Sequence, residues 1–243
     1  MRWVERDPHR AGFLDRALLD ALGTRVRGTR WLDAGCGEGR VARALARRGA
    51  TVLGVDVAAP LVAAARRAAR TLPAAARARL TFETADLAAR GLLPPGGLDG
   101  VVCALALMHV KGPAPALKAW ARALKPGGRL VLLLPHPCFM GPGTSWTARL
   151  PQVPRGPARP LALEVADYPV RGVQRFRFDA AFPAATTNYH HSLEALSDAL
   201  ARAGFALDRL GEPRPAAALV AREPSYAPYA RVPFFLLVEA RTR

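Results

Sequence analysis

Trp31-Leu-Asp-Ala-Gly-Cys-Gly-Glu-Gly39 is the stretch from which the architecture of this chain follows. It reads as a short apolar strand, then a glycine-rich turn, then an Arg- and Ala-rich helix that starts near Gly39. Gly35, Gly37 and Gly39 allow a sharp turn and the close approach of a ligand that a Cβ would block. Asp33 is expected at the carboxyl end of the strand, where open α/β sheets bind ligands. Its negative charge suits a cationic or amine-bearing ligand better than a pyrophosphate.

A second acidic residue follows at a spacing that suits nucleoside binding. Asp56 ends the apolar run Thr51-Val-Leu-Gly-Val-Asp56, which comes shortly after the helix. An acidic group at the tip of the second strand is the usual partner of a ribose diol. The two carboxylates together indicate a nucleoside with a positively charged or amino-acid-like tail. A nicotinamide-binding turn looks similar, but the spacing here is Gly-x-Gly-x-Gly and the acidic residue precedes the first glycine.

The two motifs resemble those of the class I S-adenosylmethionine-dependent methyltransferases. Residues 33–39 are similar to the first motif of that family, and residues 54–57 to the next. The resemblance covers most of residues 29–134 and, more loosely, the final strands. It implies an α/β fold, a Rossmann-like doubly wound sheet of seven strands, mostly parallel, whose antiparallel last strand lies between the fifth and the sixth. It also implies S-adenosyl-L-methionine as the cofactor.

The resemblance also implies which residues hold that cofactor. The methionine part would contact the glycine-rich turn, at Asp33, Ala34, Gly35, Cys36 and Gly37. Asp56 would take both ribose hydroxyls, and Val57 would lie against the adenine. Asp86 would accept a hydrogen bond from the adenine amine, with the Leu87 N–H facing the ring, although an aspartate after a strand can be only a helix N-cap. Backbone groups after the fourth strand would meet the methionine amine, at Cys103 and Ala104.

Apolar periodicity predicts the order of the other elements. Strands are expected over residues 30–34, 51–55, 80–83, 98–105, 129–134, 205–210 and 232–240. Helices are expected over 11–22, 39–48, 61–72, 115–124 and 192–203, the last capped by Ser192. Strands that alternate with helices at this spacing indicate a parallel, doubly wound sheet.

The segment between the fifth strand and the last helix, residues 135–191, is too long for an ordinary connection and is rich in proline. Within it, Tyr168–Phe178 alternates enough to form a strand or a hairpin. We interpret residues 1–243 as a single methyltransferase domain in which 135–191 is a lid over the carboxyl edge of the sheet. A partly disordered surface loop is the alternative.

Catalytic residues are expected in that variable region. Transfer from a sulfonium needs a nucleophile held about 3 Å from the methyl carbon with water excluded. A general base is needed only for a hydroxyl or a protonated amine. Four residues flank the edge where the methyl group should emerge, His136, His190, His191 and Glu212, and the catalytic candidates among them are His136, His190 and Glu212. Each histidine could instead be a cap or a satisfied loop group. No carboxylate or cysteine completes a metal-ligand spacing with the histidines, so we predict no metal site.

The amino-acid composition limits the classes of protein to which this chain can belong. A chain of 243 residues that is 51% hydrophobic can bury the core of one large domain. It has no apolar run long enough to cross a bilayer and no signal-peptide pattern at its N-terminus. Its three cysteines are widely spaced. We therefore expect a reduced, cytoplasmic protein without disulfides.

The formal charge of +16 raises the possibility of a nucleic-acid substrate. However, only three of the 35 basic residues are lysine, and the arginines are scattered through every helix, as expected of a GC-rich coding sequence. The favoured function is therefore methyl transfer to a small-molecule acceptor. The alternatives are a tRNA or rRNA methyltransferase that uses the basic surface, and a non-catalytic cofactor-binding regulatory protein. The sequence leaves the oligomeric state open.

Overall fold

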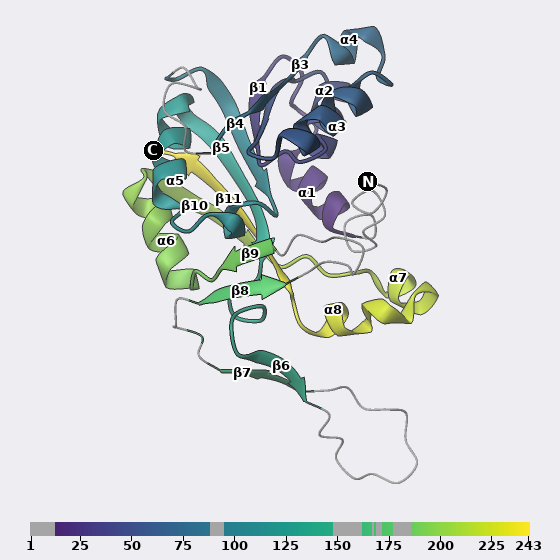
Figure 1. The fold of residues 1–243 in the computed structure, drawn as a ribbon, viewed down its shortest axis with the longest axis vertical. Helices are drawn as coiled ribbons and strands as arrows, with labels where there is room; N and C mark the ends of the chain where they lie inside the picture. Colours follow the sequence, from purple (N-terminus) through teal and green to yellow (C-terminus); the bar gives the residue numbers. More distant parts are fainter. Residues whose placement is uncertain (1–12, 88–94, 148–161, 167, 169–171, 177–185) are drawn as a thin grey trace.

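A computed structural model describes residues 13–87, 95–147, 162–166, 168, 172–176 and 186–243. Its main sheet has seven strands in the order β10-β11-β5-β4-β1-β2-β3 (Figure 1). They are β1 (Arg30–Ala34), β2 (Thr51–Asp56), β3 (Leu80–Thr84), β4 (Leu98–Ala104), β5 (Leu124–Pro135), β10 (Phe205–Gly211) and β11 (Phe235–Thr242). Strands β1 to β5 run parallel to one another, and β11 runs antiparallel between β5 and β10. The predicted fold class is confirmed.

Helices cover both faces of this sheet (Figure 1). One face carries α1 (Asp15–Leu22), α2 (Arg40–Arg47) and α3 (Ala59–Ala69), and the other carries α5 (Ala114–Ala123) and α6 (Leu193–Arg202). Shorter elements are α4 (Ala74–Arg77), η3 (Leu107–His109), α7 (Ala217–Arg222), η4 (Pro224–Tyr226) and α8 (Ala227–Arg231). The sheet therefore has a hydrophobic core on each side.

Each core follows from the apolar pattern of its helices. Helix α2 buries Val41, Ala42, Leu45 and Ala46, which share one face at helical spacing. On the opposite side, Trp120 of α5 is fully buried, and its indole N–H donates to the Leu87 carbonyl at 3.1 Å. Between these two cores, β1, β2, β3 and β4 all end at one common edge of the sheet.

The largest differences from the sequence-based expectation lie at β5 and before β11. Strand β5 begins at Leu124 rather than at residue 129, because Leu124 already pairs with Leu98 of β4; Lys125–Gly128, with Gly127 left-handed at φ +71°, form an irregularity before the pairing resumes at Arg129. Strand β11 begins at Phe235 rather than at residue 232, and the proline-rich connection that precedes it forms α7, η4 and α8. These elements pack Tyr226 and Tyr229 against Phe13 and Phe235. No periodic pattern in this proline-rich stretch predicts that aromatic cluster.

The segment 135–191 contributes two hairpins. Strand β6 (Thr144–Thr147) pairs with β7 (Ala162–Val165), and β8 (Val173–Phe176) pairs with β9 (Thr186–Tyr189). Residues 148–161, 167, 169–171 and 177–185 lie outside the described part of the chain, so only β8 of the expected strand over 168–178 can be compared. In Figure 1, β8 and β9 lie beyond the ends of β4 and β5. His109 Nδ1 lies 2.9 Å from the Thr187 carbonyl and holds β9 at this edge.

None of the helices in the described ranges combines the length and the apolarity that a bilayer crossing requires. The three cysteines, Cys36, Cys103 and Cys138, are free thiols.

Candidate functional site

The glycine-rich turn between β1 and α2 is left-handed at three positions. Gly35, Gly37 and Gly39 have φ of +74°, +52° and +72°. A Cβ on Gly35 would lie 2.2 Å from the Cβ of Ala106, and one on Gly39 would lie 2.6 Å from the Phe82 ring. A Cβ on Gly37 would meet nothing within 4 Å. Packing therefore demands glycine at 35 and 39, whereas the space beside Gly37 is open to a ligand.

Asp56 at the end of β2 is tied to this turn. Its Oδ2 accepts the Gly37 N–H at 2.9 Å, and its Oδ1 accepts the Ala58 N–H at 2.8 Å. The side chain stays half-exposed, and each carboxylate oxygen keeps capacity for a further donor. The next residue, Val57, is 73% exposed. A carboxylate beside an exposed apolar side chain fits the ribose and adenine parts of a nucleoside.

Asp33 does not share that exposure. It is 1% exposed, and its Oδ2 accepts the Ala42 N–H at 2.9 Å. Ala42 lies in the first turn of α2, whose N-cap residue Gly39 offers no side-chain cap, so Asp33 satisfies an otherwise free helix N–H from the neighbouring strand. Burial raises the pKa of Asp33 to about 7. In this structure its carboxylate fastens the turn to α2, and direct contact with the methionine part stays a prediction.

The other predicted cofactor residues gather at the same edge. Ala34 and Cys36 are buried, and burial raises the pKa of the Cys36 thiol above its ordinary value. The Ala85 N–H donates to the Asp56 carbonyl at 3.1 Å, which places the exposed Asp86 and the half-buried Leu87 beside the end of β2. Their roles toward the adenine stay predictions.

Cys103 and Ala104 end β4. Cys103 is fully buried, which raises the pKa of its thiol to about 12, while Ala104 is half-buried. The following residue, Leu105, is left-handed at φ +56°, and its N–H donates to the Leu133 carbonyl at 2.7 Å. The chain therefore turns sharply beside the glycine-rich turn. The contact of these backbone groups with the methionine amine stays a prediction.

The structure brings His136 and Glu212 together. His136 follows β5 and Glu212 follows β10, and His136 Nε2 lies 3.5 Å from Glu212 Oε1. The Cys138 N–H donates to His136 Nδ1 at 3.2 Å, so the ring proton of the neutral form sits on Nε2, toward the carboxylate. Burial lowers the pKa of His136, and Glu212 opposes that shift. Because the Nδ1 lone pair is engaged, this pair is better suited to joining two strand ends than to accepting a substrate proton.

His190 has the opposite arrangement. Its Nε2 lies 2.8 Å from the Tyr168 carbonyl, and a carbonyl only accepts, so the neutral ring carries its proton on Nε2 and a lone pair on Nδ1. A Cβ on Gly141 would lie 3.1 Å from that Nδ1, so the ring packs against Gly141 and leaves no room there for a larger residue. Ser192 caps α6 through the Ala195 N–H at 3.2 Å, as predicted, and fixes the chain just after His190.

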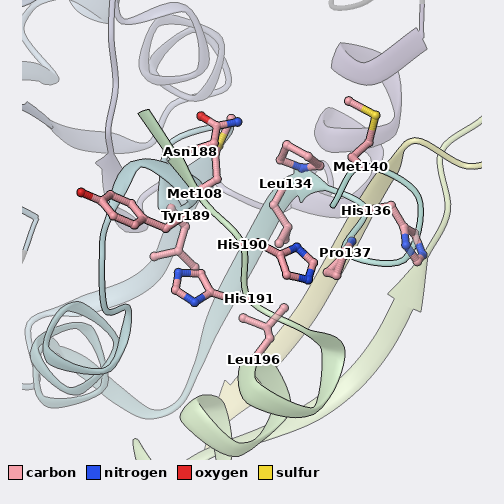
Figure 2. Close-up of a pocket in the computed structure, with 12 residues that line it drawn as sticks. Met108, Leu134, His136, Pro137, Met140, Asn188, Tyr189, His190, His191 and Leu196 are labelled. Carbon is pink, nitrogen blue, oxygen red and sulfur yellow. The ribbon is translucent and has the colours of Figure 1, made fainter. Parts of the chain in front are cut away.

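His136 and His190 line one pocket at the carboxyl edge of the sheet (Figure 2). Its enclosed volume is about 40 Å³. The lining is mostly apolar, with Leu134, Met140 and Leu196 among its members. Within the described ranges no three histidine, cysteine or carboxylate side chains form a cluster that could hold a metal ion.

Asn188 is a pocket residue that sequence reasoning missed. Its side chain is 8% exposed, and its Oδ1 has no hydrogen-bond partner among the described residues. It lies in a segment without a recognisable motif. The one available signal was its rarity, because Asn188 is the only asparagine of the chain.

Comparison with known proteins decides the family. A model of the methyltransferase domain matches residues 32–132. The crystal structure of an S-adenosylmethionine dependent methyltransferase from Mesorhizobium loti is 31% identical, has a TM-score of 0.75, and covers 93% of this chain and 96% of that one. This chain belongs to the S-adenosylmethionine-dependent methyltransferases.

Two further relatives of this methyltransferase agree with the assignment. The crystal structure of a putative S-adenosylmethionine dependent methyltransferase from Listeria monocytogenes is 23% identical with a TM-score of 0.72 over 95% of each chain, and shows the fold. The ubiquinone biosynthesis O-methyltransferase of Xanthomonas campestris pv. campestris is 38% identical over 136 residues. That match covers 54% of this chain and 55% of the relative, so the chain spans about half the length of the curated relatives it matches.

Proposed function

We propose that this chain transfers the methyl group of S-adenosyl-L-methionine to a small-molecule acceptor whose proton is taken by His190. One observation carries the proposal: an open glycine turn tied to Asp56 and a pocket containing His190 lie at the same edge of the sheet. The relatives support the acceptor class, since one of them is by name an O-methyltransferase of ubiquinone biosynthesis.

Each site residue has a separate role in this function. Asp56 accepts from the ribose hydroxyls while it holds Gly37, and Val57 covers the adenine. Asp33 keeps the turn fastened to α2. When bound, the cofactor supplies a methyl group carried on a positively charged sulfur. After the transfer this sulfur is the neutral thioether of the leaving product. His190 Nδ1 accepts the proton that a hydroxyl or amine nucleophile loses as its bond to the methyl carbon forms.

We infer that residues 135–191 act as a lid within a single domain. Their described part supports this role, because β9 is bonded to η3 through His109 and Thr187 and carries His190 to the edge of the sheet. The lid would exclude water from the reacting atoms. An RNA acceptor is not favoured, since no lysine or arginine is found among the described residues that line the pocket.

The test is the fate of a labelled methyl group. The protein is incubated with methyl-labelled S-adenosyl-L-methionine and either the small-molecule fraction of a bacterial extract or its total RNA. We expect label in the small-molecule fraction. Label in RNA alone would instead support the RNA methyltransferase, and cofactor binding without any transfer would support the non-catalytic regulatory protein.

A further inference from the structure

The single asparagine of the chain has an unusual environment. Asn188 is more than nine-tenths buried, yet its Oδ1 has no partner in the described part of the protein. Buried polar side-chain atoms nearly always have a hydrogen-bond partner, and an unpaired one lowers stability. A buried asparagine that is left unpaired inside a pocket points to a ligand that supplies the missing donor.

The surroundings define what kind of donor this is. The pocket walls are largely apolar, with Met108 and Met140 among the lining residues. None of the described lining residues is a carboxylate that would compensate a cationic donor. Transfer of a charged group into such surroundings is strongly unfavourable. The matching group is therefore an uncharged N–H or O–H.

Asn188 and His190 are placed to contact one molecule. They are two residues apart on an extended segment, because the β8–β9 ladder continues to the His190 N–H, which donates to the Gly172 carbonyl at 2.9 Å. Two residues of extended chain span about 7 Å. In the view of Figure 2 the Asn188 amide lies at one end of the pocket, Leu196 at the other, and the His190 ring between them.

We propose that Asn188 selects the methyl acceptor, by accepting through Oδ1 a hydrogen bond from an uncharged hydroxyl or N–H group on that molecule. The inference rests on the proposed function and names its substrate class: a neutral acceptor with a hydrogen-bond donor near the atom that is methylated. The enclosed volume of about 40 Å³ admits the donor-bearing end of such a molecule, and the remainder lies outside.

Nuclear magnetic resonance can test this directly, because ¹⁵N-asparagine labelling gives one side-chain amide signal in this chain. The labelled protein is saturated with S-adenosylhomocysteine and titrated with phenol, aniline or anisole. These probes are similar in size, but anisole donates no hydrogen bond. We expect phenol and aniline to shift the Asn188 amide signal in a saturable way, and anisole to leave it unchanged.

A matched pair of variants gives the second readout. Asn188→Asp keeps the accepting oxygen, whereas Asn188→Leu keeps the branched shape and removes it. We expect Asn188→Leu to bind phenol and anisole equally, with S-adenosylhomocysteine affinity unchanged, and Asn188→Asp to retain the preference for phenol. Thermal unfolding confirms that each variant folds.

Three results would overturn the proposal: equal shifts with anisole and phenol, no shift with any probe up to its solubility, or a phenol preference that survives in Asn188→Leu. The labelled-methyl experiment remains a separate measurement. A donor-specific shift without methyl transfer would refute the proposed function while leaving the recognition by Asn188 in place.

Discussion

Asp33 shows how one carboxylate can serve the site without facing it. It lies in the first motif of the family, and its charge was expected to meet the ligand. In the structure it accepts the Ala42 N–H nine residues later in the chain. Because it is buried, the folded protein holds its proton far more tightly than an exposed carboxyl does. The protonation state of Asp33, which holds the turn against α2, therefore depends on pH.

That link predicts a pH-dependent stability. The pKa of Asp33 is raised from 3.8 to about 7. Between these values the unfolded chain loses the proton while the folded chain keeps it, so the contribution of Asp33 to stability falls as pH rises and is constant above about pH 7. Urea unfolding of Asp33→Asn, which cannot ionise, should lack this component, of order 4 kcal/mol at most. Identical pH profiles for the variant and the wild type would contradict the assignment.

The two pocket histidines should respond differently to substitution. The Nδ1 of His190 has no hydrogen-bond partner among the residues that the structure describes, whereas the Nδ1 of His136 is engaged by the Cys138 N–H. We expect His190→Gln to lower turnover by about 10²–10⁴-fold with little change in cofactor affinity. We expect His136→Gln mainly to lower the unfolding temperature. Steady-state kinetics and thermal melts of both variants decide this, and the reverse order of effects would refute the choice of His190.

Asn188→Leu should raise stability while it impairs recognition. The wild-type Oδ1 is buried without a partner, and such groups lower stability by about 1–3 kcal/mol. An apolar side chain of similar shape relieves that penalty. We expect a higher urea midpoint for Asn188→Leu than for the wild type, both without ligand. A clearly lower midpoint would mean that the amide has a structural partner instead.

Among the elements, the sequence predicted those that local patterns specify. The strand–turn–helix at residues 30–47 and the place of β11 in the sheet follow from glycine spacing, alternation and the family resemblance. Helices α7 and α8 did not, because proline interrupts any periodicity; Tyr229 of α8 packs against Phe13, and Leu219 and Val220 of α7 pack against the core.

The candidate site likewise contains some residues that the sequence predicted and others that it did not. Asp56 and the open Gly37 lie in a motif, so the sequence placed them. The pairing of His136 with Glu212 and the unsatisfied Asn188 depend on contacts between distant segments. A hydrogen-bond deficit in particular is a property of three-dimensional surroundings, and no sequence pattern records it.

Gly141, in the loop after β5, allows that loop to approach the His190 ring closely. A Cβ on Gly141 would lie 2.9 Å from His190 Cε1, so Gly141→Ala must displace the ring. We expect turnover to fall at least about tenfold, or ~1.4 kcal/mol. Gly112→Ala is the matched control, because a Cβ there meets nothing within 4 Å. If both variants turn over alike, Gly141 does not set the position of His190.

Over the domain as a whole, the net charge of +16 invites phosphate binding that is unrelated to catalysis. Many described arginines form ion pairs on the surface, such as Arg241 with Asp208 and Arg209 with Glu239. We expect any binding of total tRNA to weaken steeply with added salt and to leave the RNA unmethylated. Salt-resistant binding together with labelled RNA would favour the RNA alternative.

The central claim is that the fold brings Gly37 and Asp56 together as the binding site for one sulfonium-bearing nucleoside. Calorimetric titration of S-adenosyl-L-methionine into the wild type and Asp56→Ala tests it most directly, with the exposed Asp198→Ala on α6 as the control. We expect the wild type and the control to bind alike, and Asp56→Ala to lose at least about tenfold in affinity, ~1.4 kcal/mol. No binding by the wild type, or unchanged binding by Asp56→Ala, would contradict the account.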